Sequence, residues 1–214
     1  MDTPSCEQLK QESMKDKSPL LFSSLSITFI ILIVWFVSIS VTGAEWNENI
    51  KSLNENWNTF NSLSTIWRLE ALVVCGIAWA AFNLSSLSKW WNLVALGHIL
   101  MLAEYIFMLG GYKHVSSEET FQILNEMANW TFITANFIGV FGILGIYWKE
   151  SKTIKYIGVV LSGITLILIG AIYFGIGAQA QLTPVAMPFV LLLYGFNSFY
   201  GLKLFKRIKA HNNV

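Results

Sequence analysis

The feature that most constrains this chain is a run of 47 residues, from Tyr156 to Leu202, without a single charged side chain. One helical crossing of a bilayer takes ~20 apolar residues, so the run is long enough to cross twice. Its middle is punctuated by residues typical of a turn between two spans. These are Gly175, Gly177, Gln179, Gln181 and Pro184. The pattern predicts a polytopic membrane protein.

Composition agrees with that class, because 54% of the residues are hydrophobic and only 13% are charged, against about 25% charged in a soluble domain. Six apolar segments are expected to span the bilayer. They are about 20–42, 65–87, 90–111, 130–148, 155–176 and 185–204. Helices are expected throughout, since these runs lack the two-residue alternation of a membrane β-barrel. The predicted fold class is an all-α membrane protein, a bundle of six transmembrane helices.

The distribution of lysine and arginine predicts the orientation. Eleven of the 14 fall in the N-terminal tail, in the turn between the second and third spans, in the turn between the fourth and fifth spans, or at the C-terminal end. With six spans, all four of these regions lie on the same side of the membrane. An excess of basic residues marks the cytoplasmic side. We therefore expect a cytoplasmic polar tail at 1–18, a six-span membrane domain at 19–205 and a cytoplasmic basic tail at 206–214.

The first segment has an alternative interpretation as a cleaved signal peptide, with Ala44 as its last residue. Its apolar run, from Ser18 to Ala44, is much longer than the core of a signal peptide, and its polar head contains four acidic residues. We therefore favour a retained span.

Two short amphipathic helices are expected on the outer face. The segment from Glu45 to Ser64 places its large apolar residues on one helical stripe. A second helix is expected at about 117–129, where Ser116 and Glu119 have the spacing of a capping box. Such helices either lie on the membrane interface as connectors or act as a lid or docking surface, and we favour the connector.

Ionisable side chains inside spans are costly and are therefore candidate functional groups. Arg68 and Glu70 near the start of the second span, and Glu104 near the end of the third, lie at similar depths from the outer surface. We expect them to meet there, with Glu104 and Arg68 as the favoured pair, and Asn136 of the fourth span to join them. This cluster is either a proton- or ion-binding site or an architectural clamp between helices.

His98 lies nearer the cytoplasmic surface than Glu104, six residues earlier in the same span. Asn197 of the sixth span and Asn83 of the second are polar partners at compatible depths. A neutral histidine with hydrogen bonds between helices is the simple interpretation. A proton relay or ligand contact is the alternative.

The sequence contains none of the metalloprotease, serine hydrolase or nucleotide-binding motifs, and no CxxC pair. The histidines are not placed to hold a haem between facing helices. We therefore expect no catalytic residues, no cofactor and no metal site.

Between about residues 65 and 205 the chain resembles a large group of small bacterial six-span membrane proteins of unknown function. The resemblance rests on Ile66-Trp67-Arg68-Leu69-Glu70, on the Gly139–Gly142 spacing, and on Ile157-Gly158-Val159-Val160-Leu161. It implies a bacterial inner membrane and carries no activity.

Taken together, these patterns favour a multi-pass inner-membrane protein that is a non-enzymatic structural, sensory or accessory component. The alternative is a small transporter or channel with an outer-leaflet ion or proton site at Glu104, Arg68 and Glu70. The lipid bilayer is its expected partner, a membrane-protein partner or a homo-oligomer stays open, and no nucleic acid is expected.

Overall fold

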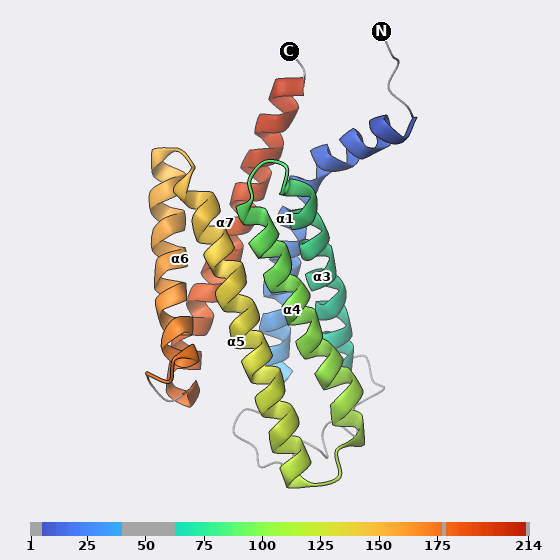
Figure 1. Ribbon diagram of the computed structural model, residues 1–214, viewed down its shortest axis with the longest axis vertical. Coiled ribbons are helices and arrows are strands. Elements are labelled where there is room, and N and C mark those ends of the chain that lie inside the picture. Colours follow the sequence, from blue (N-terminus) through green and yellow to red (C-terminus); the bar gives the residue numbers. More distant parts are fainter. Residues whose placement is uncertain (1–5, 40–62, 177–178, 213–214) are drawn as a thin grey trace.

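The computed structural model of the protein describes residues 6–39, 63–176 and 179–212, and in these ranges it contains helices and no strand. Figure 1 shows α1 (Cys6–Ile39), α3 (Leu63–Leu84), α4 (Trp90–Gly111), the 3-10 helix η1 (Tyr112–His114), α5 (Glu118–Trp148), α6 (Lys152–Tyr173) and α7 (Gln179–Asn212). Six of these helices are long and apolar enough to cross a membrane. The prediction of an all-α fold with six candidate spans is confirmed.

Helix ends follow local signals in the sequence. The third predicted span, 90–111, coincides with α4. The second ends at Leu84, before 87, because the serine-rich segment after it turns and the Leu87 amide donates to the Leu84 carbonyl. The fifth ends at Tyr173, before 176. Gly175 follows it with φ of +67°, the left-handed conformation in which glycine commonly terminates a helix.

The first and last helices are longer than predicted, at 34 residues each. A helix of that length is ~51 Å long, well beyond the ~30 Å of a hydrocarbon core. Their apolar portions are Lys17–Val37 and Val185–Ala210. The tails assigned to 1–18 and 206–214 are therefore largely continuations of these helices.

The prediction of a separate short helix at 117–129 is wrong, because α5 runs without a break from Glu118 to Trp148. Ser117, not Ser116, is its N-cap, and the Ser117 hydroxyl accepts a hydrogen bond from the Thr120 amide at 3.3 Å. No turn residue separates the polar stripe from the apolar span, so one helix carries both. The other predicted amphipathic helix lies almost entirely in 40–62, outside the described residues.

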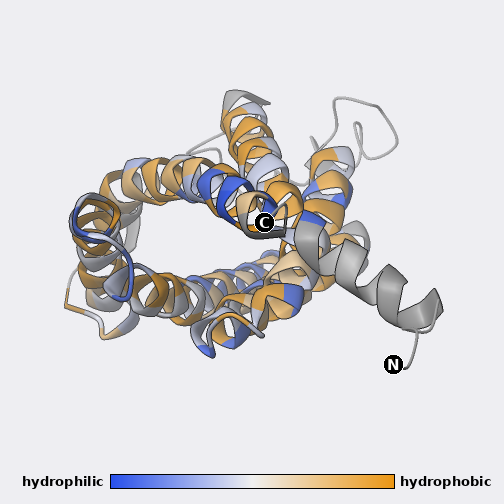
Figure 2. Ribbon diagram, turned by 90° about the horizontal axis from the view of Figure 1, so that it is seen from above, coloured by the Kyte–Doolittle hydropathy of each residue, from blue (hydrophilic) through white to orange (hydrophobic). Residues whose placement is uncertain are grey.

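The helices form a closed ring. Each packs mainly against its neighbours in the sequence, and α7 completes the ring by packing against α1. Figure 2 shows this ring from above. The start of α1 and the end of α7 lie at the same end of the ring (Figure 1), which we call the terminal end. The start of α3 and the end of α4 lie at the other end, which we call the opposite end.

The outward faces of the helices are apolar, as a lipid-facing surface requires. Leu72, Phe82 and Ile167 expose 71%, 64% and 73% of their surface. Large hydrophobic side chains with similar exposure occur on every long helix. The inward faces, in contrast, contain most of the polar side chains that are buried within the spans.

Glycines bring α4 and α5 into close contact. A Cβ atom added at Gly97 would lie 2.6 Å from the backbone nitrogen of Gly139, and one at Gly142 would lie 2.8 Å from that of Val94. Gly145 provides the space for the indole ring of Trp90. Small residues allow such close backbone approach between membrane helices. This contact holds together the wall from which Glu104, His98 and Asn136 project.

Candidate functional site: an acidic cavity inside the ring

The ring encloses a cavity of about 300 Å³ in the half of the bundle at the opposite end. Every long helix contributes to its walls. The lining residues are Ile33, Phe36, Trp67, Glu70, Glu104, Tyr105, Met108, Tyr112, Asn125, Ala128, Asn129, Phe132, Ile133, Asn136, Ile169, Ile172, Ala186, Met187 and Val190. The set is mainly apolar and aromatic, with two carboxyl groups and three asparagines as its most polar members. No lysine, arginine or histidine occurs among the described residues that line it.

The two carboxyl groups lie close together in the wall. Glu70 exposes only 2% of its surface and accepts a hydrogen bond from the Tyr105 hydroxyl. Glu104, on the adjacent helix α4, is near enough to Glu70 for their charges to interact. Oε1 of Glu70 and Oε2 of Glu104 are both buried and have no hydrogen-bond partner among the described residues. Buried carboxyl oxygens without partners are rare, and each one calls for an explanation.

The predicted pair of Arg68 and Glu104 is not formed. Arg68 is exposed on the outside of α3, and the described residues contain no ion pair between it and a carboxylate. Residues two apart on a helix point about 200° apart, so only one of Arg68 and Glu70 can face the ring. The buried residue is the carboxylic acid. The three charged residues therefore do not form one cluster, whereas Glu70 and Glu104 do meet.

Asn136, which the sequence led us to expect beside Glu104, lines the same cavity. It is buried, and its Nδ2 donates to the Phe132 carbonyl one turn earlier at 2.9 Å. It also borders a void of only about 10 Å³ that is lined by His98 and Tyr194, among others. Asn136 therefore marks the floor of the cavity, where the open space gives way to close packing.

Tyr112 and Trp67 form an aromatic corner of the wall. Their ring centroids are 5.7 Å apart and the planes are tilted by 49°. The Tyr112 hydroxyl donates to Oδ1 of Asn125 at 3.0 Å. Burial, and to a lesser extent the charge of Glu104, raises the pKa of Tyr112 to about 12. Tyr112 therefore remains a neutral hydrogen-bond donor at physiological pH, and the two glutamates provide the acidity of the site.

His98 and Asn197 are both buried but do not contact each other through a hydrogen bond. Nδ1 of His98 lies 2.7 Å from the Val94 carbonyl, which requires Nδ1 to carry the proton. Nε2 then accepts from the Tyr194 hydroxyl at 2.8 Å. A neutral histidine bonded between helices was the simple interpretation, but its partner is a tyrosine. Asn83, the other expected partner, donates to the Trp79 carbonyl of its own helix.

Asn197 is paired with a different tyrosine. The Tyr147 hydroxyl donates to Oδ1 of Asn197 at 2.6 Å, which ties α5 to α7. Neither tyrosine was predicted as a partner, because Tyr147 and Tyr194 lie in apolar runs where a tyrosine cannot be told from any other aromatic residue of the span. Each tyrosine bonds to a residue of another helix, so the pairing depends on how the helices pack against each other.

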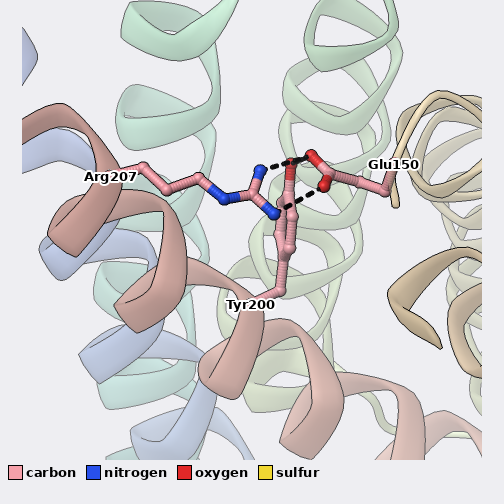
Figure 3. Close-up of polar contacts among 3 residues, drawn as sticks. All are labelled: Glu150, Tyr200 and Arg207. Atoms are coloured by element: carbon pink, nitrogen blue, oxygen red, sulfur yellow. Dashed lines mark hydrogen bonds and ion pairs between the residues drawn. The ribbon is translucent and has the colours of Figure 1, made fainter. Parts of the chain in front are cut away.

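A further polar cluster joins the α5–α6 turn to α7 at the terminal end (Figure 3). Glu150 accepts hydrogen bonds from the Tyr200 hydroxyl at 2.8 Å and from both terminal nitrogens of Arg207, with the ion pair at 2.9 Å. Partial burial alone would raise the pKa of Glu150, but the bonds from Arg207 and Tyr200 hold it below its ordinary value. This carboxylate is therefore ionised and satisfied. In the sequence, Glu150 is notable because it is an acidic residue in a turn that otherwise contains lysines.

The arrangement defines what the site can do. Among the described residues no group of three or more histidine, cysteine, aspartate or glutamate side chains is placed to hold a metal ion. Two adjacent carboxyl groups with open oxygens, beside a tyrosine donor, can hold a proton or a cation between them. The described lining residues include no serine, threonine, cysteine, lysine or histidine.

Comparison of the chain with family models, with curated proteins and with solved structures found no match. The six apolar helices are compatible with a multi-pass membrane protein. The cavity is therefore the feature from which a function can be inferred.

Proposed function

We propose that the protein is a small transporter that binds a cation, a proton included, in the acidic cavity between its helices. The observation that carries this proposal is the pair of Glu70 and Glu104. They line one cavity, each has a buried oxygen without a hydrogen-bond partner, and the described residues of the lining include no lysine, arginine or histidine. A buried polar group without a partner costs ~1–3 kcal/mol. A bound cation is the partner that would recover this cost.

The protein sits, in this proposal, in a bacterial inner membrane with both termini in the cytoplasm. Support comes from the lysine and arginine bias, which favours a cytoplasmic position for the terminal end. The cavity then lies in the outer half of the bilayer. The resemblance to small bacterial six-span proteins agrees with this location.

A second candidate function is a sensory or accessory protein that binds the same cation without moving it. The close packing beneath the cavity favours it. His98 and Tyr194 bond to each other there, and Gly97 and Gly139 bring two helix backbones together. In the described residues the cavity does not extend through this layer. A transporter would have to open it during its cycle, whereas a sensor would not.

Flux into proteoliposomes tests transport. Purified protein is reconstituted with a pH-sensitive dye inside, and a proton gradient or a membrane potential is applied. We expect proton or cation flux in the parent protein, and at least a tenfold loss in Glu104→Gln and in Glu70→Gln. Glu119→Gln is the matched control, because Glu119 is an exposed glutamate in the first turn of α5.

The results separate the two functions. No flux in the parent protein, together with glutamate-dependent cation binding, would select the sensory or accessory role. Flux that is unchanged in both cavity variants would contradict the proposed site.

Orientation is tested separately with a reporter that is active only in the cytoplasm. It is expected to be active when fused after Val214 or inserted in the turn 149–151. It is expected to be silent when inserted at Val115, between η1 and α5. The inverted pattern would place the cavity in the inner half of the bilayer.

A further inference from the structure

We propose that the ligand of the cavity is a hydrophobic organic cation, a protonated or quaternary amine with apolar substituents. This inference rests on the proposed cation site and names its ligand class. It is drawn from the chemistry of the walls, the volume of the cavity and the position of its two carboxyl groups.

The walls of the cavity suit an apolar molecule. Five aromatic side chains line it, and most of the others are aliphatic or methionine side chains. The aromatic residues are Phe36, Trp67, Tyr105, Tyr112 and Phe132. The faces of such rings attract cations, most strongly when the cation is poorly hydrated, and aromatic cages recognise quaternary ammonium groups in this way. Trp67 and Tyr112, whose ring centroids are 5.7 Å apart, both belong to this aromatic lining.

A bare or hydrated metal ion suits these walls less well. Calcium takes 6–8 oxygen ligands and magnesium keeps a near-octahedral shell of oxygens. Here two carboxyl groups come from α3 and α4 and three asparagine amides come from α5, while the described parts of α6 and α7 contribute apolar residues such as Ile169, Ile172 and Val190. A ligand with one charged end and an apolar body matches this asymmetry.

The volume supports the same conclusion. About 300 Å³ is the lower end of the range for small-molecule pockets, and it equals the share of liquid volume of roughly ten water molecules. A monatomic ion would leave most of it empty, whereas an amine that carries one ring would fill it.

The charge balance favours a single positive charge. The described lining residues include two carboxyl groups and no basic side chain. One carboxylate can therefore pair with the ligand while the other keeps a proton. Ligand binding and proton binding then compete at one site. The apparent affinity for the cation is therefore expected to fall as the pH is lowered.

The test uses benzyltrimethylammonium and its neutral carbon isostere, neopentylbenzene, with the full-length protein in detergent. Binding is measured by calorimetry and by the shift in melting temperature. We expect the cation to bind and to raise the melting temperature, and the isostere to bind at least tenfold more weakly. In the double variant Glu70→Gln/Glu104→Gln the affinity for the cation is expected to fall at least tenfold. Glu119→Gln is expected to bind the cation with the affinity of the parent protein.

A second variant addresses the aromatic wall. Trp67→Leu keeps an apolar side chain and both glutamates, and we expect it to weaken cation binding several-fold while affecting the isostere little. If Trp67→Leu does not fold, Phe132→Leu replaces it. Equal loss of cation and isostere would mean that the ring acts only as apolar surface and would overturn the cation–π part of the inference.

The outcomes distinguish this inference from the proposed function. Glutamate-dependent proton or metal-ion flux without benzyltrimethylammonium binding would overturn the ligand class and leave the cation site standing. Equal binding of the cation and the neutral isostere would also overturn the ligand class. No binding and no flux would contradict both.

Discussion

At the terminal end of the bundle Glu150 accepts hydrogen bonds from Tyr200 and Arg207, whereas at the opposite end Glu70 and Glu104 each have a buried oxygen without a partner among the described residues. The difference extends to the rest of the two halves. His98 and Asn197 are bonded by tyrosines in the layers between the cavity and Glu150, although the Nδ2 of Asn197 has no partner among the described residues. In one half of the ring the helices are packed closely and joined by hydrogen bonds between side chains, whereas the other half surrounds a cavity.

This difference separates structural polar groups from candidate functional ones. A polar network with its hydrogen bonds made holds helices in one register, and it requires nothing further. In Glu70 and Glu104 one buried oxygen of each carboxyl group has no partner among the described residues, and this destabilises the ring unless a ligand or proton is bound. Mutations should therefore have opposite consequences in the two halves.

The largest effect is expected from Gly97→Ala, at the contact between α4 and α5. Its Cβ would lie 2.6 Å from a backbone nitrogen, which no rotamer change can relieve. Overpacking a tight contact costs typically ~1–3 kcal/mol and occasionally more, so we expect a large drop in melting temperature in detergent. Gly163→Ala in α6 is the control, because a Cβ there meets nothing within 4 Å. Similar melting temperatures for the two variants would contradict the close contact.

The tyrosine bonds come next. Tyr194→Phe leaves Nε2 of His98 without its donor, and Tyr147→Phe does the same to Oδ1 of Asn197. We expect each to lower stability by ~1–3 kcal/mol, the cost of stranding a buried polar group. Tyr156→Phe, on an exposed side chain, should change little. A melting curve for each variant decides, and a neutral Tyr194→Phe would mean that His98 finds another partner.

A smaller effect is expected from Glu150, because its partner Arg207 is 42% exposed and such pairs contribute at most ~1 kcal/mol. The folded pKa of Glu150 lies below its ordinary value. Its contribution is therefore fully present above the unfolded pKa of ~4.3 and is lost as the pH falls through the lower folded value. Between about pH 5 and pH 3, the parent protein should lose more stability than Glu150→Gln. Parallel pH profiles would show that the cluster contributes nothing.

The smallest effect on stability, and the one of opposite sign, is expected from Glu104→Gln. With no arginine paired to it, removal of its charge strands no partner and relieves the burial of an acidic group beside Glu70. We expect an unchanged or slightly higher melting temperature, combined with the loss of cation binding. A marked drop in stability would instead indicate a structural clamp, as the sequence alone had suggested.

The sequence predicted the number of spans and most of their positions, because apolar length and charge bias are one-dimensional signals. It also indicated that Glu70, Glu104 and Asn136 lie at a similar depth below the outer surface of the membrane. It did not predict which side of α3 faces the ring. Arg68 and Glu70 are two residues apart, and the choice between them depends on how α3 packs against α1 and α4. Opposite charge suggested the Arg68–Glu104 pair, but the helix orientation places Arg68 outside.

The partners of the buried polar groups were unpredictable for a related reason. His98 and Asn197 were placed in the correct helices, yet each bonds to a tyrosine from another helix and not to the other. Depth along a helix can be counted from sequence, whereas the rotation of each helix follows from contacts such as that of Gly97 with Gly139. The cavity has no sequence signal at all, since it is the space that six helices leave between them.

Chemical labelling tests the central contrast most directly. A hydrophobic carbodiimide reacts with protonated carboxyl groups in apolar surroundings and leaves ionised carboxylates in water unmodified. When the intact protein is labelled in membranes at neutral pH and analysed by peptide mass spectrometry, our account predicts modification at Glu70 or Glu104, suppressed by benzyltrimethylammonium, and none at Glu150. Modification of Glu150 with both cavity glutamates unlabelled would contradict it.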